Sequence, residues 1–490
     1  MTDLDQPLAF DHHSAECTAD PVAYYARFRE QCPVGRSDAY GGFTYTTRYA
    51  DVVRIARDDA TFSSAREFAA GEGTVIVIPR GAGLEQFPIE LDPPRATEYR
   101  DLINPLLTQA AVEKMLPMIA RHTTRIIDAF IASGSCDFVD DLTNPLPAAV
   151  TLDWLGFPES DWAPLAGPIH DIFAAVAGSE RAIRGGMGLA HMDQRIRELV
   201  RERRENPQAD AVSVLIAARR PDGSEFGEDE LVSVIGLLIA GGVDTTTSLT
   251  GSTLVHLARN PQQRRQLVDS PELLDTATEE FLRAFAPSQS MARTATGDTE
   301  VGGCPLGAGD RVLIPWVAAN HDPEVFPEPE QVRLDRDASR HLSFGIGSHR
   351  CAGAHLARAM FREMMTQILH RLPDYEIDEA GLVAIRPGGT SPAGTHPGPI
   401  HPGPTGLLSR GDLFRNRPSG PVPADRDRRG SGRRRRDLAD PGPPRRQRVA
   451  GLDAGCAPGG PAALRPGPAV LALRCNRSRW LPGGGAARTG

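Results

Sequence analysis

One cysteine lies in a glycine-rich segment whose residue types suit a metal-binding thiolate. Residues 344–353 read Phe-Gly-Ile-Gly-Ser-His-Arg-Cys-Ala-Gly, and the apolar residues that follow recur every four positions, which predicts a helix after the loop. Cys351 therefore lies where a loop enters a helix N-terminus, and the dipole and free N–H groups there favour a thiolate. Gly345 and Gly347 can take backbone angles that let a tight loop aim N–H groups at the sulfur. Proteins hold haem iron for O–O bond cleavage with such an electron-rich thiolate.

A single cysteine is more often a buried structural residue than a ligand, so Cys351 alone does not decide between the two interpretations. The whole segment, however, matches the pattern F-G-x-G-x-H-x-C-x-G without departure. It thereby resembles the cysteine-ligand loop of the cytochrome P450 family. The resemblance implies that Cys351 binds the haem iron and that Phe344 and Gly345 belong to the loop that surrounds it. Gly353 would let the flat haem lie close to the backbone.

A second segment places an acid and hydroxyl groups in an apolar helix. Residues 237–247 read Leu-Leu-Ile-Ala-Gly-Gly-Val-Asp-Thr-Thr-Thr, apolar nearly all round, so the helix should be buried. A buried acid is costly without a partner or a role, and threonine hydroxyls can bond a backbone carbonyl and open a local bulge. These features fit either a kinked core helix with a capped aspartate or a pair that relays protons to bound oxygen.

The same segment resembles the oxygen-activation motif of the family, which is Ala or Gly, Gly, any residue, Asp or Glu, and Thr. Carried over residue by residue, the resemblance implies that Asp244 is the acid and Thr245 the alcohol. It also implies that Gly241 and Gly242 leave space for O₂.

A third motif is a glutamate and an arginine one helical turn apart. Glu280 and Arg283 can form an ion pair, although surface helices contain many such pairs. The motif lies between the other two in the family's order, so the resemblance implies a structural ion pair behind the haem, with Arg336 as its third member. The family usually has an aromatic residue where Val332 stands.

Haem carries two propionates and needs cations at its rim. By motif position, the resemblance assigns this role to Arg100, Arg293 and His349. Each of these residues alone would more often be a solvated surface group. Many relatives also carry a histidine one turn before the first arginine, where this chain has Ala96, so one propionate contact is expected to be missing.

Composition points to a soluble, intracellular chain. The 490 residues include 7 scattered cysteines with no C-x-x-C pair, which argues against a disulfide framework and a zinc site. The N-terminal segment is acidic and polar, unlike a signal peptide. No run of residues approaches the roughly 18 apolar residues that span a membrane. We therefore expect a cytoplasmic protein that binds neither a membrane nor nucleic acid.

The hydrophobic periodicity predicts a mainly α fold with small β-sheets. Helical patterns cover most of residues 95–285, and strand-like pieces occur near 40–45, 299–301 and 311–314. Residues 64–90 form a predicted loop with an apolar run that could be a lid, a substrate wall or a strand. The resemblance implies the cytochrome P450 fold for a haem-thiolate monooxygenase domain over residues 1–385.

Residues 386–490 differ from the rest of the chain in composition. Residues 401–490 hold 18 arginines and 6 aspartates, a net charge of +12, so residues 1–400 carry −21. Proline and glycine make up about a third of residues 401–490, as in low-complexity sequence. We interpret the tail as disordered or translated out of frame.

The resemblance implies a function for the whole chain. Haem b would use O₂ to oxidise a small apolar substrate, with electrons from NAD(P)H through ferredoxin reductase and ferredoxin. An acidic ferredoxin would dock where arginines gather near the cysteine loop, at Arg340, Arg350, Arg358 and Arg362. Two alternatives remain: a haem-binding relative without turnover, favoured by the unusual tail, and a peroxide-driven enzyme, disfavoured by the intact acid and alcohol.

Overall fold

The computed structural model describes residues 9–66, 76–79, 85–174, 179–378 and 473–474. All of these residues belong to one compact unit, and a second unit, Phe414–Pro468, lies outside the described residues. The predicted tail, residues 386–490, likewise lies outside them apart from Leu473 and Arg474. The predicted boundary near residue 385 also falls in an undescribed segment.

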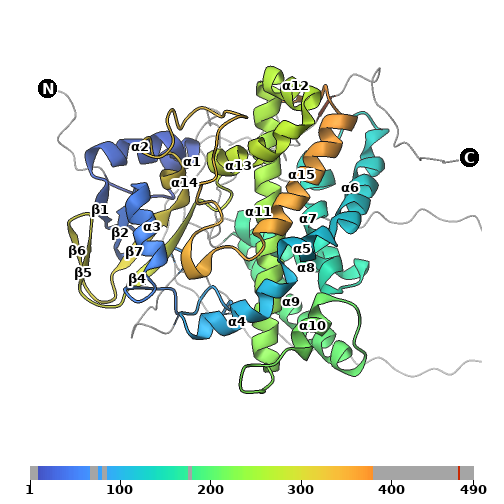
Figure 1. Cartoon of the computed structure of the whole chain (residues 1–490), viewed down its shortest axis with the longest axis horizontal. Helices are drawn as coiled ribbons and strands as arrows, with labels where there is room; N and C mark the ends of the chain where they lie inside the picture. The colour runs from blue at the N-terminus through green and yellow to red at the C-terminus, as the bar shows by residue number, and fades with distance from the viewer. Residues whose placement is uncertain (1–8, 67–75, 80–84, 175–178, 379–472, 475–490) are drawn as a thin grey trace, which may run out of the picture. The chain divides into compact units, whose positions relative to one another are not determined.

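Helices account for most of the described chain (Figure 1). In chain order they are α1 (Ala15–Ala19), α2 (Pro21–Gln31), η1 (Ala39–Gly41), α3 (Tyr49–Arg57), α4 (Arg95–Ile103), η2 (Asn104–Leu106), α5 (Gln109–Glu113), α6 (Leu116–Ile131), η3 (Val139–Thr143), α7 (Pro145–Leu155), α8 (Glu159–Ala174), α9 (Glu180–Glu205), α10 (Ala211–Ala217), α11 (Glu228–Arg259), α12 (Pro261–Asp269), η4 (Pro271–Leu273), α13 (Leu274–Phe285), α14 (Trp316–Asn320), η5 (Gly347–His349) and α15 (Ala354–Arg371).

The strands are short and form small sheets. They are β1 (Val34–Ser37), β2 (Phe43–Thr46), β3 (Phe62–Ser63), β4 (Ser290–Ala295), β5 (Thr299–Val301), β6 (Cys304–Leu306), β7 (Arg311–Pro315), β8 (Glu376–Ile377) and β9 (Leu473–Arg474). The largest sheet has the order β1-β2-β7-β4-β3, and only β2 and β7 pair in parallel within it. β5 pairs with β6, and β8 pairs with β9. The prediction of a mainly α fold with small sheets is confirmed.

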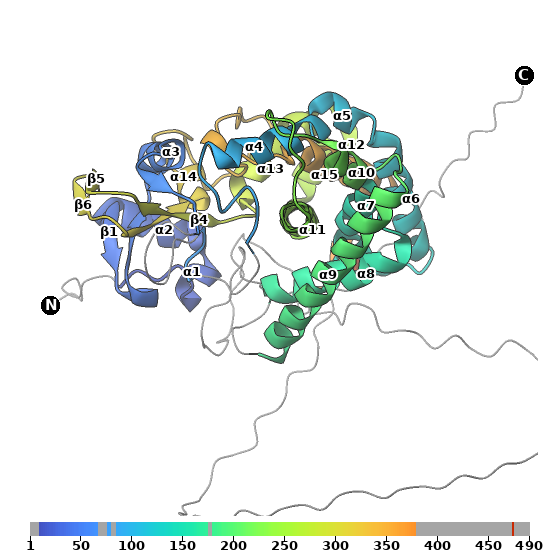
Figure 2. The same ribbon diagram turned by 90° about the horizontal axis from the view of Figure 1, so that it is seen from below.

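The long helix α11 is the axis of the helical part. It packs against α7, α8, α9, α13 and α15, and Figure 2 shows it end-on among its neighbours. Its buried residues continue from Leu231 to Leu257, because a helix that is apolar nearly all round must be covered on all sides. One 18-residue window of α11, with a mean hydropathy of 1.5, would suffice to cross a membrane by composition. Half of that window is buried in the protein, as expected for a core helix.

The structure makes two sequence expectations more specific. Within the helical pattern expected over residues 95–285, α5 and α6 are separate helices, because Pro117 lacks an N–H group and lies in the first turn of α6. Of the alternatives left open for the apolar run in the predicted loop 64–90, the strand is not adopted by residues 76–79, which are irregular. The carbonyl oxygen of Ile76 nevertheless accepts a hydrogen bond of 2.8 Å from the N–H of Ala292 in β4. This bond ties the segment to the sheet.

The predicted ion-pair triad is present and fully enclosed. Arg283 on α13 donates to both oxygens of Glu280 at 2.7 and 2.8 Å, and Arg336 donates to the same carboxylate at 3.0 Å. Glu280 and Arg283 are 0% exposed, and Arg336 is 7% exposed. The remaining N–H groups of Arg283 reach the carbonyl oxygens of Asn320, Pro329 and Gln331. The triad thus fastens α13 to the irregular segment 322–336.

Replacing Glu280 with glutamine should destabilise the fold strongly. The variant keeps the side-chain shape but leaves two buried guanidinium groups without their counter-charge, which costs about 3–5 kcal/mol of unfolding free energy. Urea unfolding followed by circular dichroism measures this loss. The exposed Glu272 of η4 is the matched control, since Glu272→Gln should change stability by less than about 0.5 kcal/mol. Equal stability of the two variants would contradict a structural role for the triad.

Candidate functional site

A cavity of about 520 Å³ lies against α11 and the cysteine loop. It brings together residues that are far apart in the sequence. All of the residues predicted for the site line it: Arg100, Gly241, Gly242, Asp244, Thr245, Arg293, Phe344, Gly345, His349, Cys351 and Gly353. The described structure therefore supports a single site to which the cysteine loop and the acid–alcohol segment of α11 both contribute.

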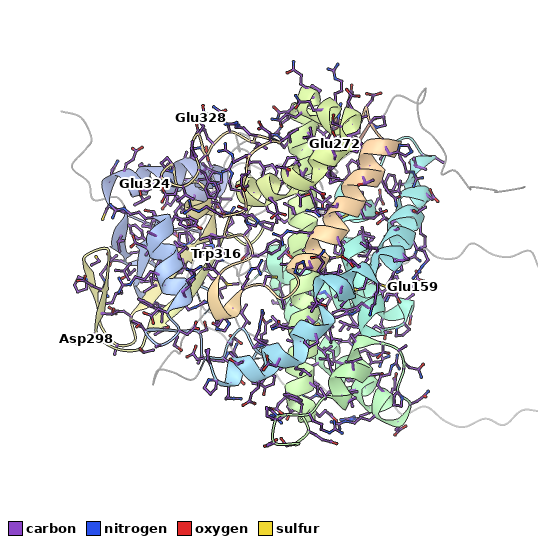
Figure 3. All side chains as sticks on the ribbon, in the orientation of Figure 1. Glu159, Glu272, Asp298, Trp316, Glu324 and Glu328 are labelled. Atoms are coloured by element: carbon purple, nitrogen blue, oxygen red, sulfur yellow. The ribbon has the colours of Figure 1, made fainter. Side chains whose placement is uncertain are left out.

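The cysteine loop is held in a tight conformation by its glycines. Gly345 and Gly347 have φ angles of 64° and 81°, a region that residues with a Cβ rarely adopt. A Cβ on Gly347 would also overlap the carbonyl oxygen of Ala56 at the end of α3. Gly345 lies beside the buried Trp316, which Figure 3 labels in the interior of the ribbon. The N–H of Cys351 donates to the carbonyl oxygen of Phe344 at 2.8 Å and closes the loop.

The thiol of Cys351 faces the cavity. Its side chain has accessible surface, but this surface faces the cavity, so the sulfur behaves as a buried group. Burial raises the pKa of the Cys351 thiol, whereas a hydrogen bond from the Gly353 N–H and the nearby charge of Arg100 lower it. The space beside Gly353 is open, because a Cβ on Gly353 would meet no atom closer than the sulfur of Cys351, at 3.9 Å.

A second network supports the loop from outside the cavity. Arg358 on α15 donates to both oxygens of Glu279 at 2.6 Å, and its guanidinium group lies 4.5 Å from the ring centroid of Phe344. His341 also bonds Glu279, at 3.2 Å. Burial alone would raise the pKa of Glu279, but the hydrogen bonds from Arg358 and His341 lower it to about 2. The ion pair therefore persists throughout the neutral pH range and holds Phe344 in place.

The side chains of Arg100, Arg293 and His349 gather at the cavity, and no carboxylate of the described residues is bonded to them. Burial lowers the pKa of Arg293 to about 10, and its Nε has no hydrogen-bond partner among the described residues. Burial, together with the charges of Arg293 and Arg100, lowers the pKa of His349 to about 3. The buried Nε2 of His349 also lacks a partner in the described part of the chain. Such unsatisfied donors are costly unless an anionic ligand accepts from them.

The acid and the alcohol of α11 each have a partner. The hydroxyl of Thr245 donates to the carbonyl oxygen of Gly241 at 3.1 Å, as the sequence predicted, and α11 is still helical throughout. The expected local bulge is therefore not seen. Asp244 Oδ1 lies 2.7 Å from Nδ1 of His170 on α8. Sequence reasoning missed His170, because a lone histidine 74 residues away carries no local signal.

The two adjacent glycines of α11 have different surroundings. A Cβ on Gly241 would meet nothing within 4 Å, whereas a Cβ on Gly242 would lie 2.6 Å from Oγ1 of Thr151 on α7. Gly241 thus leaves open space beside the cavity. Gly242 also lines the cavity and is in addition required for the close approach of α7.

Comparisons with known proteins agree with this site. Residues 189–270 and 266–373 match the family model described as Cytochrome P450. The chain is 34% identical over 384 residues to Cytochrome P450 130 of Mycobacterium tuberculosis, covering 76% of this chain and 93% of that protein. The chain belongs to the cytochrome P450 family.

Two further cytochrome P450 proteins are similar to this chain. It is 32% identical over 366 residues to the Steroid C26-monooxygenase of Mycolicibacterium smegmatis, covering 74% of this chain and 88% of that protein. The crystal structure of CYP109E1 from Bacillus megaterium in complex with testosterone superposes with a TM-score of 0.69 at 27% identity, covering 77% of this chain and 97% of that one. The mostly helical architecture is the cytochrome P450 fold.

This cytochrome P450 is a monooxygenase, and its cofactor is haem. The cavity fits that cofactor on three counts. A thiol faces the cavity, the backbone beside it is open at Gly353, and the unsatisfied donors of Arg293 and His349 are suited to carboxylates. Ala96, which stands where many relatives carry a histidine, is 1% exposed and contributes no polar group.

Alanine substitutions at Gly241 and Gly242 should differ in their effect on stability, because only Gly242 packs closely against α7. Gly242→Ala forces its methyl group against Thr151 and should lower the unfolding free energy by about 1–3 kcal/mol. Gly241→Ala has room and should leave stability unchanged or raise it by up to about 1 kcal/mol. Urea unfolding of both variants measures the difference. Thr151→Ala combined with Gly242→Ala should restore most of the loss, and a double variant as unstable as Gly242→Ala would contradict the steric explanation.

Proposed function

We propose that Cys351 would hold the haem iron through its thiolate and that this enzyme oxidises small apolar substrates with electrons from NAD(P)H, delivered through a ferredoxin reductase and a ferredoxin. The observation that carries the proposal is the gathering of one thiol, one acid–alcohol pair and three donors for carboxylates around a single cavity. The haem-thiolate domain in this proposal is residues 1–385, and its location is the cytoplasm.

The cysteine loop supplies the ligand. The Gly353 N–H bonded to the sulfur and the charge of Arg100 both favour the thiolate over the thiol. A thiolate ligand gives the iron electron density that favours O–O cleavage. When bound, haem activates O₂ so that one oxygen atom enters the substrate and the other leaves as water.

Arg100, Arg293 and His349 are the proposed partners of the haem propionates. Arg293 is 4% exposed, and such a buried guanidinium group gains most from a charged acceptor. Its nearest acidic influences are Asp59 and Asp92, which act on it only through space. The propionates would therefore supply acceptors for the donors that the protein leaves unsatisfied.

Asp244 and Thr245 are the proposed catalytic pair. Both lie on the part of α11 that borders the cavity, and O₂ reduction to water consumes protons that a buried site must import. The Thr245 hydroxyl can accept from one neighbour while it donates to another. It can therefore orient a proton donor beside the space left open by Gly241.

The cavity wall favours an apolar substrate. Ile76, Leu237 and Met291 line it, whereas the neighbouring apolar residues Ile78 and Val243 are buried in the core. Because similar proteins are named as a steroid monooxygenase and crystallised with testosterone, steroids are the first class of substrate to test.

The proposed docking face for the ferredoxin centres on Arg350. Arg350 and Arg340 are exposed, but Arg358 is paired with Glu279, and Arg362 with Asp275 at 3.0 Å. The four-arginine cluster expected from the sequence therefore has two members that are already neutralised. Exposed cations near the ligand loop would steer an acidic donor protein toward the haem.

The alternative of a haem-binding relative without turnover has little support in the described residues. The composition of residues 386–490 suggested this alternative, and most of those residues lie outside the described part of the chain. A peroxide-driven reaction would not need the proton relay, yet Asp244 and Thr245 both line the cavity. Oxygen-dependent monooxygenation accounts for more of the site.

Removing the proposed ligand should change the absorbance spectrum of the reduced protein in carbon monoxide. The wild type should give the strongly red-shifted Soret band of thiolate-ligated haem, and Cys351→Ala should lose it because no sulfur remains to donate electron density. Cys304→Ala, which removes a partly buried thiol from β6, should keep the wild-type band. A wild-type spectrum of histidine-ligated haem would overturn the assignment of Cys351.

Reversing the charge of Arg350 should slow electron delivery without disturbing the haem site. Arg350→Glu weakens the attraction for an acidic ferredoxin, so reduction at low ionic strength should slow about tenfold and the difference should shrink in high salt. Stopped-flow reduction by a ferredoxin measures the rate, and the carbon monoxide spectrum checks the haem. Arg265→Glu on the exposed side of α12 should reduce at the wild-type rate. Unchanged reduction of Arg350→Glu would reject this docking face.

A further inference from the structure

His170 joins helix α8 to the acid of α11. Its Nδ1 lies 2.7 Å from Asp244 Oδ1, and its side chain is 5% exposed, against 18% for Asp244. The ring also lines the cavity. Because a carboxylate can only accept a hydrogen bond, the proton between the two groups belongs to Nδ1 when Asp244 is ionised. Asp244 is therefore already bonded to a group that can give it a proton.

Charged groups from three elements lie around this pair. They are Asp140 on η3, Arg181 on α9 and Asp171 on α8 itself. Arg181 and Arg184 hold the carboxylate of Asp171 at 2.8 and 2.7 Å, so Asp171 is already paired. Asp140 and His170 influence each other through their charges.

Asp140 is an acid of η3 whose charge acts on His170. Burial, together with the charges of Asp137 and Asp141, raises the pKa of Asp140 to about 6, while the charges of His170 and Arg181 act in the opposite direction. The side chain is only partly buried, so it can regain protons from water. A group with such a pKa exchanges protons readily at neutral pH.

A purely structural explanation accounts for less of this arrangement. Apolar side chains could fasten α8 to α11 without removing an acid and a base from water. The hydroxyl of Thr245 donates to Gly241 rather than to Asp244, so the alcohol does not supply the acid with a proton. His170 is the group positioned to do so.

We propose that protons enter the cavity from the α8 side, passing through the ring of His170 to Asp244. The proposal rests on the function proposed above for Asp244 and Thr245. When a proton reaches Nε2 of the neutral ring, Nδ1 releases its own proton to Asp244 Oδ1, and rotation of the ring restores the first arrangement. One proton leaves the solvent for each that arrives at Asp244, and no electrons move. His170 acts through Asp244 and is thus a positioning residue.

The decisive variant is His170→Gln in the full-length haem-loaded enzyme. Glutamine can still donate a hydrogen bond to Asp244 but cannot carry a proton through its side chain. Oxygen consumption is measured with NADH and an excess of reduced ferredoxin, in H₂O and in D₂O, so that no substrate needs to be known. We expect His170→Gln to slow it about 10- to 100-fold, to enlarge the solvent isotope effect and to flatten the pH profile. His191→Gln, an exposed position on α9, should match the wild type.

A second readout does not depend on turnover. In the reduced, carbon monoxide-inhibited protein, nitrogen NMR of labelled histidine follows the two ring nitrogens of His170, identified by their loss in His170→Gln. Their shifts should place a proton on Nδ1, as for a ring that donates to the carboxylate of Asp244.

The outcomes separate the two proposals. Wild-type oxygen consumption and isotope effect in His170→Gln would overturn the proton path, and so would ring shifts that show no proton on Nδ1. Either result would leave the thiolate assignment intact if the carbon monoxide band is normal. Loss of that band in the wild type would instead overturn the function of the site itself.

Discussion

The excess of buried positive charge around the cavity is the constraint on which the rest of the structure depends. Arg100 and Arg293 are both desolvated there, and each lacks a bonded carboxylate among the described residues. Such a group destabilises a folded chain until an anion pairs with it. If its propionates pair with these groups as proposed, the haem would contribute to stability as well as to chemistry, and its binding would be linked to folding.

Two buried ion-pair networks hold the cysteine loop rigid beside these cations. Glu280, Arg283 and Arg336 lock α13 to the segment before the loop, while Glu279 and Arg358 join α13 to α15 after it. The adjacent glutamates of α13 thus fix both sides of the loop. A thiolate ligand needs this rigidity, because its electron donation depends on a fixed distance and on hydrogen bonds to the sulfur.

The site residues that could be predicted from the sequence are those whose motif lies within one short segment. The cysteine loop, the acid–alcohol pair and the glutamate–arginine pair are each contained within a few residues, and the sequence predicted them and their helices. His170 and Thr151 owe their roles to contacts between helices. His170 is 74 positions from Asp244, and Thr151 is 91 positions from Gly242. No local periodicity records such contacts. The pairing of Arg358 escaped prediction for the same reason, since only the fold brings Glu279 to it.

Helix α11 meets opposite requirements at neighbouring positions. Gly241 must leave space for a ligand, whereas Gly242 must leave space for α7, and one turn of helix presents both because successive residues point about 100° apart. The acid that follows is bound to α8 rather than to its own helix. A movement of α8 relative to α11 would therefore change the hydrogen bonding of Asp244. Since α8 and α11 both border the cavity, the substrate that fills it can influence how the acid is protonated.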